Sequence, residues 1–183
     1  MAAAQRQRAF PGDVVCEPQR RWLGVDAGLR AKLPKSGQAG IVSGRWLLSP
    51  RYRYLPQVDI VIPGRERLEN ELLGANVITV DVPALSRLEC VARLIPRDTP
   101  ILMIAHQPAD EHLGLLNYVD TAVSSTAEPI YYLCIGLRIP FDAVLATCIY
   151  TGIAFDTGRF RFSCTTPNAL VIAGEWCALG SVA

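Results

Sequence analysis

Apolar and polar positions alternate in blocks from about residue 48 onwards. Three short apolar runs have the length and composition of strands, and apolar residues recur at helical spacing between them. The expected strands are Val58–Ile62, Asn76–Val80 and Thr99–Ile104, and the expected helices are Arg65–Leu73 and Pro83–Leu94. Mainly apolar strands joined by helices predict right-handed βαβ units, and therefore an α/β fold with a mostly parallel sheet flanked by helices.

The second half of the chain is expected to be mainly helical. Asn117–Asp120 predicts a short extended piece, and Ser125 with Glu128 fits a capping box in which each side chain bonds to the backbone of the other. That helix should end near Gly136. Polar start signals predict two further helices, one opened by Pro140 and Asp142 and running to about Ala154, and one opened by Thr166 and Pro167.

The first 47 residues carry no sustained period of either two or 3.6 residues. We therefore expect two parts in the chain: a poorly specified segment over residues 1–47 and an α/β domain over residues 48–183. A length of 183 residues suits one domain.

Composition and net charge indicate which kinds of partner and which cellular compartment are expected. Hydrophobic residues make up 50% of the chain, charged residues 19%, and the net charge is +1, so no basic surface for duplex DNA or an anionic membrane is expected. No apolar run approaches about 20 residues, the length that spans a membrane. The six cysteines show no zinc-finger spacing, and we expect reduced thiols in a cytoplasmic protein: Cys16, Cys90, Cys134, Cys148, Cys164 and Cys177.

Three side chains stand where a ligand site is expected. Asp81 and His106 follow two predicted strands, and ligands of open α/β sheets bind outside the carboxyl ends of the strands. Asp156 ends a long apolar run and is followed by Thr157 and Gly158, so it is either a presented acid or an ordinary turn residue. His112 lies in a polar loop, where a solvated side chain is expected.

Several motifs recur in a fixed order between about residues 49 and 174. Each is weak alone, but together they resemble the DHH phosphoesterase family, most of all its bifunctional oligoribonuclease and 3′-phosphoadenosine-5′-phosphate phosphatase branch. The motifs are Val77–Asp81 with Ser86–Leu88, Ala105-His106-Gln107-Pro108, Asn117–Asp120 with Ser124–Glu128, and Thr151–Gly158 with Phe160–Ser163 and Thr165–Pro167.

The resemblance implies the fold of the N-terminal DHH domain and hydrolysis of short oligoribonucleotides or nucleotide phosphates with a pair of metal ions, usually Mn²⁺. Carboxylates and imidazole suit that ion. By this resemblance Asp81 bridges the metals, His106 and Asp156 complete one metal site, and the three form the catalytic centre. Gln107 and Arg161 then contact the substrate phosphate, although an exposed Arg is the commoner case. A homodimer is one assembly that the resemblance allows.

The chain departs from the family pattern in three ways. The Asp-His-His triplet of the family is Ala105-His106-Gln107 here, and glutamine can donate a hydrogen bond but no proton. The first motif is missing, with only a faint echo at Pro11–Asp13, and the C-terminal substrate-binding domain is expected to be absent. Two hypotheses follow: a phosphoesterase that is impaired because one metal site is lost, or an inactive remnant with a binding or structural role only.

Overall fold

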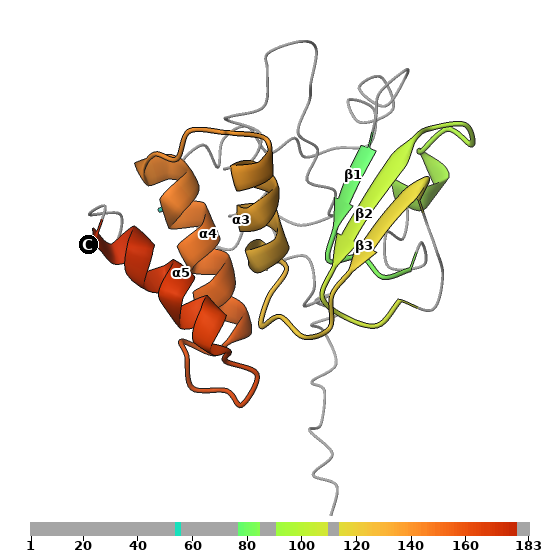
Figure 1. Cartoon of the computed structure of the whole chain (residues 1–183). Helices are drawn as coiled ribbons and strands as arrows, with labels where there is room; N and C mark the ends of the chain where they lie inside the picture. The colour runs from blue at the N-terminus through green and yellow to red at the C-terminus, as the bar shows by residue number, and fades with distance from the viewer. Residues whose placement is uncertain (1–53, 56–76, 85–90, 110–113, 179–183) are drawn as a thin grey trace, which may run out of the picture.

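The computed structural model describes residues 54–55, 77–84, 91–109 and 114–178 (Figure 1). Several predictions lie outside these residues: the strand Val58–Ile62, the helix Arg65–Leu73, the segment 1–47 with its boundary, and the environment of His112. The description below concerns the sheet and the helices that follow it.

Three parallel strands form the sheet. Strands β1 (Val77–Val80), β2 (Ile101–Ala105) and β3 (Leu116–Val119) lie side by side in the order β1-β2-β3. Val80 is paired with Ile104, and Ile104 with Tyr118, so the three strands end at the same edge. The predicted α/β fold with a parallel sheet is confirmed, and the short extended piece proves to be its third strand.

The predicted helix Pro83–Leu94 is not found where the structure describes that stretch. Residues 82–84 form no helix, residues 85–90 lie outside the described part, and Val91–Arg93 is a short 3-10 helix, η5. Two prolines account for part of the difference between the predicted and the observed elements. Pro96 disfavours helical backbone in the residue before it. Pro100 has no N–H for the sheet, so β2 begins at Ile101 rather than at Thr99.

Three helices follow the sheet and lie on one side of it (Figure 1). They are α3 (Ala127–Gly136), α4 (Ala143–Asp156) and α5 (Pro167–Ala178), with α3 nearest the sheet. Asp142 caps α4 by accepting a hydrogen bond from the Leu145 N–H at 3.0 Å. Thr166 Oγ1 accepts one from the Ala169 N–H at 3.1 Å, with Pro167 in the first position of α5. Both predicted starts are confirmed, while α4 continues past Ala154 to Asp156.

The start of α3 differs from the predicted capping box. Ser125 Oγ accepts from the Ala127 N–H at 3.1 Å, and Glu128 Oε1 accepts from the N–H of Ser124, not of Ser125, at 2.7 Å. The reciprocal pairing was therefore wrong. Glu128 is buried and also accepts from Asn168 Nδ2 at 2.7 Å, so its carboxylate joins the first turns of α3 and α5.

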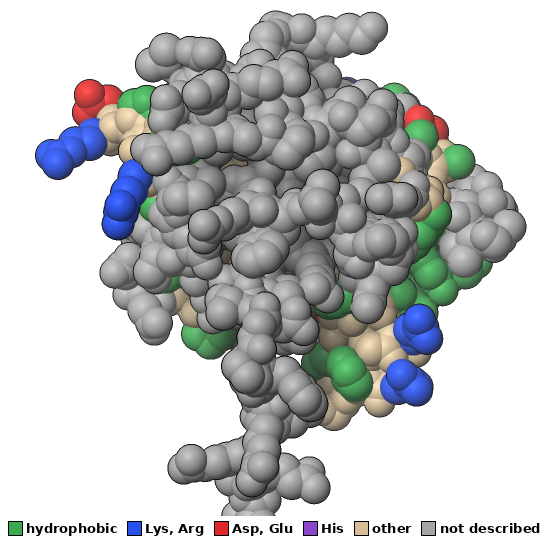
Figure 2. Space-filling view, turned by 180° about the vertical axis from the view of Figure 1, so that it is seen from behind, with side chains coloured by type: hydrophobic (Ala, Val, Ile, Leu, Met, Phe, Trp, Pro, Cys, Tyr) green, Lys and Arg blue, Asp and Glu red, His purple; other side chains and the backbone are tan. Residues whose placement is uncertain are grey.

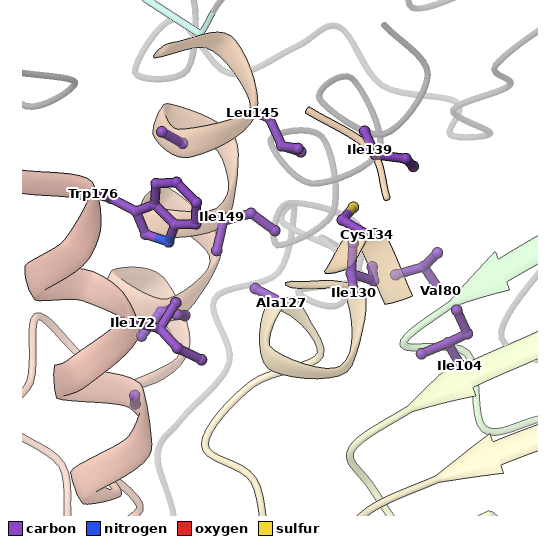
Figure 3. Packing of buried hydrophobic residues seen from close by; sticks show 13 residues of the cluster. Val80, Ile104, Ala127, Ile130, Cys134, Ile139, Leu145, Ile149, Ile172 and Trp176 are labelled. Carbon is purple, nitrogen blue, oxygen red and sulfur yellow. The ribbon is translucent and has the colours of Figure 1, made fainter. Parts of the chain in front are cut away.

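One hydrophobic core connects the sheet to the helices (Figure 3). Val80 and Ile104 point from the strands toward Ile130 of α3, and the remaining buried side chains continue through α4 to α5. The fully buried members include Ile130, Cys134, Leu145, Ile149 and Ile153, and Trp176 is 3% exposed. Within the described residues, no helix has the length and apolar character needed to cross a bilayer.

Replacing Asp142 with alanine is expected to lower the free energy of unfolding by about 1 kcal/mol, because the first turn of α4 loses its capping acceptor. Chemical denaturation measures this difference. Asp142→Asn keeps an acceptor oxygen and is the matched control. Equal losses in the two variants would contradict the capping role.

Candidate metal centre

Asp81 leaves β1 in an unusual backbone conformation. Its φ is 58°, in the left-handed region, and its N–H still donates to the Ile104 carbonyl at 2.7 Å. This conformation costs a non-glycine residue about 1–2 kcal/mol of free energy, although Asp and Asn tolerate it better than most. Such strain is concentrated at functional sites. The side chain is also buried, with 3% of its surface exposed.

His106 directly follows β2 and meets two carboxylates. Its Nε2 atom lies 3.2 Å from Asp81 Oδ1 and 3.7 Å from Asp156 Oδ2. Asp156 is the last residue of α4, and its side chain is 6% exposed, compared with 13% for His106. The structure therefore brings together the three residues that the sequence singled out, from two strand ends and one helix end.

The turn after Asp156 is held by its own hydrogen bonds. Buried Thr157 Oγ1 donates to the Ile153 carbonyl at 2.7 Å and accepts from the Phe160 N–H at 3.0 Å. Gly158 has φ +57°, and the next two residues are also left-handed, with φ values of 59° and 63°. These bonds end α4 at the residue whose carboxylate meets His106.

The donor chemistry and spacing suit part of a metal coordination sphere. Nitrogen and oxygen ligands about 2.0–2.2 Å from one ion stand about 3.0–3.5 Å apart when they are neighbours. The 3.2 Å contact falls in this range and the 3.7 Å contact slightly exceeds it. Within the described residues, no three or more His, Cys, Asp or Glu side chains form a complete group around one ion position. The residues thus fit a partial site organised around the His106 nitrogen.

The two predicted substrate contacts lie near these residues in sequence, but the structure places them differently. Gln107 is half-buried and directly follows His106. Arg161 is exposed in the turn after α4, where its Nε donates to the Gly158 carbonyl at 3.1 Å. Figure 2 shows Lys or Arg side chains beside hydrophobic side chains at the lower right of the face that it presents. Arg161 is therefore engaged within its own turn.

Thr126 is a contact that sequence reasoning missed. Its hydroxyl donates to Asp81 Oδ1 at 3.0 Å, and the residue is 5% exposed. The stretch Ser124–Glu128 was interpreted as a helix cap, which accounts for Ser125 and Glu128 but not for this threonine. The available signal was a third hydroxyl residue beside the cap, in a motif of the predicted family.

Comparison with known proteins identifies the relatives of the chain. No family model matches it. A probable bifunctional oligoribonuclease and PAP phosphatase NrnA of Streptococcus mutans is 30% identical over 159 residues, which are 87% of this chain and 49% of that protein. The Thermus thermophilus NrnA is 30% identical over 166 residues, 90% of this chain and 48% of that protein. The Bacillus subtilis NrnA is 36% identical over 116 residues, 60% of this chain and 36% of that protein.

A solved structure shows the same fold. An exopolyphosphatase-related protein from Bacteroides fragilis superimposes with a TM-score of 0.75 at 20% identity, covering 88% of this chain and 48% of that one. At the level of sequence, the chain is similar over most of its length to NrnA proteins of the DHH phosphoesterase family, which confirms the predicted resemblance. The chain spans about half the length of these curated relatives, 49% and 48% in the first two.

Proposed function

We propose that this chain forms the metal-binding part of a phosphoesterase that hydrolyses short oligoribonucleotides or nucleotide phosphates. The observation that carries the proposal is the convergence of Asp81 and Asp156 on the His106 nitrogen, at 3.2 and 3.7 Å. The names of the NrnA relatives, bifunctional oligoribonucleases and PAP phosphatases, supply the substrate class.

Charge balance supports a cation at this place. Asp81 and Asp156 are almost fully buried, and a buried charge is costly unless a partner compensates it. A divalent ion bound here would offset the charge of both carboxylates, and carboxylate and imidazole ligands suit Mn²⁺.

Ala105 favours one cation rather than the pair found in the family. This residue, which stands where the family has an aspartate, is fully buried at the end of β2. Alanine removes one negative charge from the edge of the sheet where the ligands gather. Within the described residues, Asp81 and Asp156 are the carboxylates that lie beside His106, so we propose a single Mn²⁺ ion held by Asp81, His106 and Asp156.

The residues of the chain have separate roles in the proposed reaction. When bound, Mn²⁺ lowers the pKa of a water molecule and stabilises negative charge on phosphate oxygens. Asp81, His106 and Asp156 would hold the ion as three of its ligands. Gln107 can donate an amide hydrogen bond to a phosphate oxygen, but it supplies no proton to a leaving group. Arg161 donates its Nε–H to the Gly158 carbonyl, and the Nη groups of its guanidinium remain as donors for a phosphate.

The competing proposal is an inactive domain with a binding or structural role. Two observations favour this inactive domain. Gln107 stands in place of a histidine, and the ligand group among the described residues is incomplete. This alternative predicts a folded chain without metal-dependent chemistry.

Metal removal separates the two proposals. The full chain, stripped with a chelator and then titrated with Mn²⁺ in a calorimeter, is expected to bind about one ion. The same sample should release mononucleotide from a dinucleotide only after Mn²⁺ is restored, and Ca²⁺ at the same concentration is the control for ionic strength. A folded chain that gives neither binding heat nor product would leave the inactive domain as the better account.

A further inference from the structure

Thr126 occupies the N-cap position of α3, yet its side chain does not cap the helix. A threonine in this position usually accepts a hydrogen bond from an N–H of the first turn. Here Ser125 Oγ accepts the hydrogen bond from the Ala127 N–H at 3.1 Å. The Thr126 hydroxyl instead donates to Asp81 Oδ1 at 3.0 Å, across 45 residues of sequence. A local rule that is broken in favour of a distant partner marks a functional position.

The acceptor atom is the one that faces His106. Asp81 Oδ1 lies 3.0 Å from the Thr126 hydroxyl and 3.2 Å from His106 Nε2. The carboxyl group of an aspartate rotates over a broad range, so the contacts of its oxygens determine where its lone pairs point. Thr126 and Asp81 are 5% and 2% exposed, so the Thr126 hydroxyl faces little competition from water.

The position of Thr126 is itself fixed from both sides. Glu128 binds the Ser124 N–H at 2.7 Å and Asn168 Nδ2 at 2.7 Å, which ties the first turn of α3 to that of α5. Thr126 therefore stands on a rigid support, as a residue that orients another side chain requires.

We propose that Thr126 is a positioning residue that orients the Asp81 carboxylate for cation binding; this inference rests on the proposed function, which makes Asp81 a metal ligand. Hydrogen-bond partners of metal ligands typically change metal affinity about 10–100-fold when they are removed. The hydroxyl holds one oxygen of Asp81, so its lone pairs keep the direction that His106 and the cation share.

Thr126→Val removes the hydroxyl and keeps the shape of the side chain. Calorimetry on the full chain is expected to show Mn²⁺ binding about 10–100-fold weaker than in the wild type. Thr126→Ser restores the hydroxyl and is expected to bind within about threefold of the wild type. If Thr126→Val does not fold, Thr126→Ala removes the same group with less bulk and takes its place.

Ser124→Ala is the control for a merely structural effect. It removes bonds from Ser124 Oγ to the Cys164 carbonyl and to Thr166, but leaves the contact between Thr126 and Asp81 in place. Thermal unfolding should show a loss of stability with unchanged Mn²⁺ affinity. Mn²⁺ binding that is weakened equally in Ser124→Ala, or wild-type affinity in Thr126→Val, would overturn the positioning role of Thr126 without contradicting the proposed function. A wild-type chain that binds no Mn²⁺ would overturn the proposed function and this inference with it.

Discussion

Asp81→Asn is expected to weaken Mn²⁺ binding at least about 100-fold, because even the outer partners of metal ligands contribute about 10–100-fold. The amide removes a negative charge from the centre of the site but keeps an oxygen that accepts from Thr126. Asparagine also tolerates the left-handed φ of 58° at this position, so the free energy of unfolding should stay within about 1 kcal/mol of the wild type. Calorimetry and urea denaturation measure the two quantities.

Asp98→Asn is the matched control for the change in charge. Asp98 is exposed in the turn that precedes β2, at the amino end of the strands and therefore away from the site. The Asp98→Asn variant should bind Mn²⁺ as the wild type does.

Asp81→Ala tests the backbone conformation. This variant should be about 1 kcal/mol less stable than Asp81→Asn because alanine tolerates the left-handed region poorly. Wild-type affinity in Asp81→Asn would rule out Asp81 as a ligand.

The starts of α4 and α5 could be predicted because their signals are local. Asp142 and the pair Thr166–Pro167 act on N–H groups no more than three residues away. The same holds for β1 and β2, whose apolar runs predicted strands of a parallel sheet. The position of Asp81 and His106 followed from one rule on parallel sheets, and the 3.2 Å contact agrees with it.

The features that were missed depend on residues distant in sequence. Glu128 accepts locally from the N–H of Ser124 rather than of Ser125, and its second oxygen accepts from Asn168, 40 residues away. Thr126 likewise bonds to Asp81 rather than to its own helix. The left-handed backbone of Asp81 has no sequence signal, because aspartate follows strands in ordinary turns as well. Pairings between distant elements are decided by tertiary packing, which a single sequence does not display.

Ile130 belongs to the core that connects the strands and the helix carrying the candidate metal ligands. It is fully buried on α3, packed in the cluster that contains Val80 and Ile104 of the strands and Ile153 of α4 (Figure 3). The strands end at Asp81 and His106, and α4 ends at Asp156, so the packing around Ile130 sets the distance between the ligands. A cavity there should affect both stability and metal binding.

Ile130→Ala is expected to lower the free energy of unfolding by about 2–5 kcal/mol, and Ile130→Val by about 0.5–1.5 kcal/mol, because the cost grows with the buried volume removed. Ile135→Ala, on the same helix but 47% exposed, should change it by less than about 0.5 kcal/mol. Urea denaturation gives these values, and Mn²⁺ titration of the folded variants should show weaker binding for Ile130→Ala only. Equal effects at the two isoleucines would mean that Ile130 does not join the sheet to the helices as the structure shows.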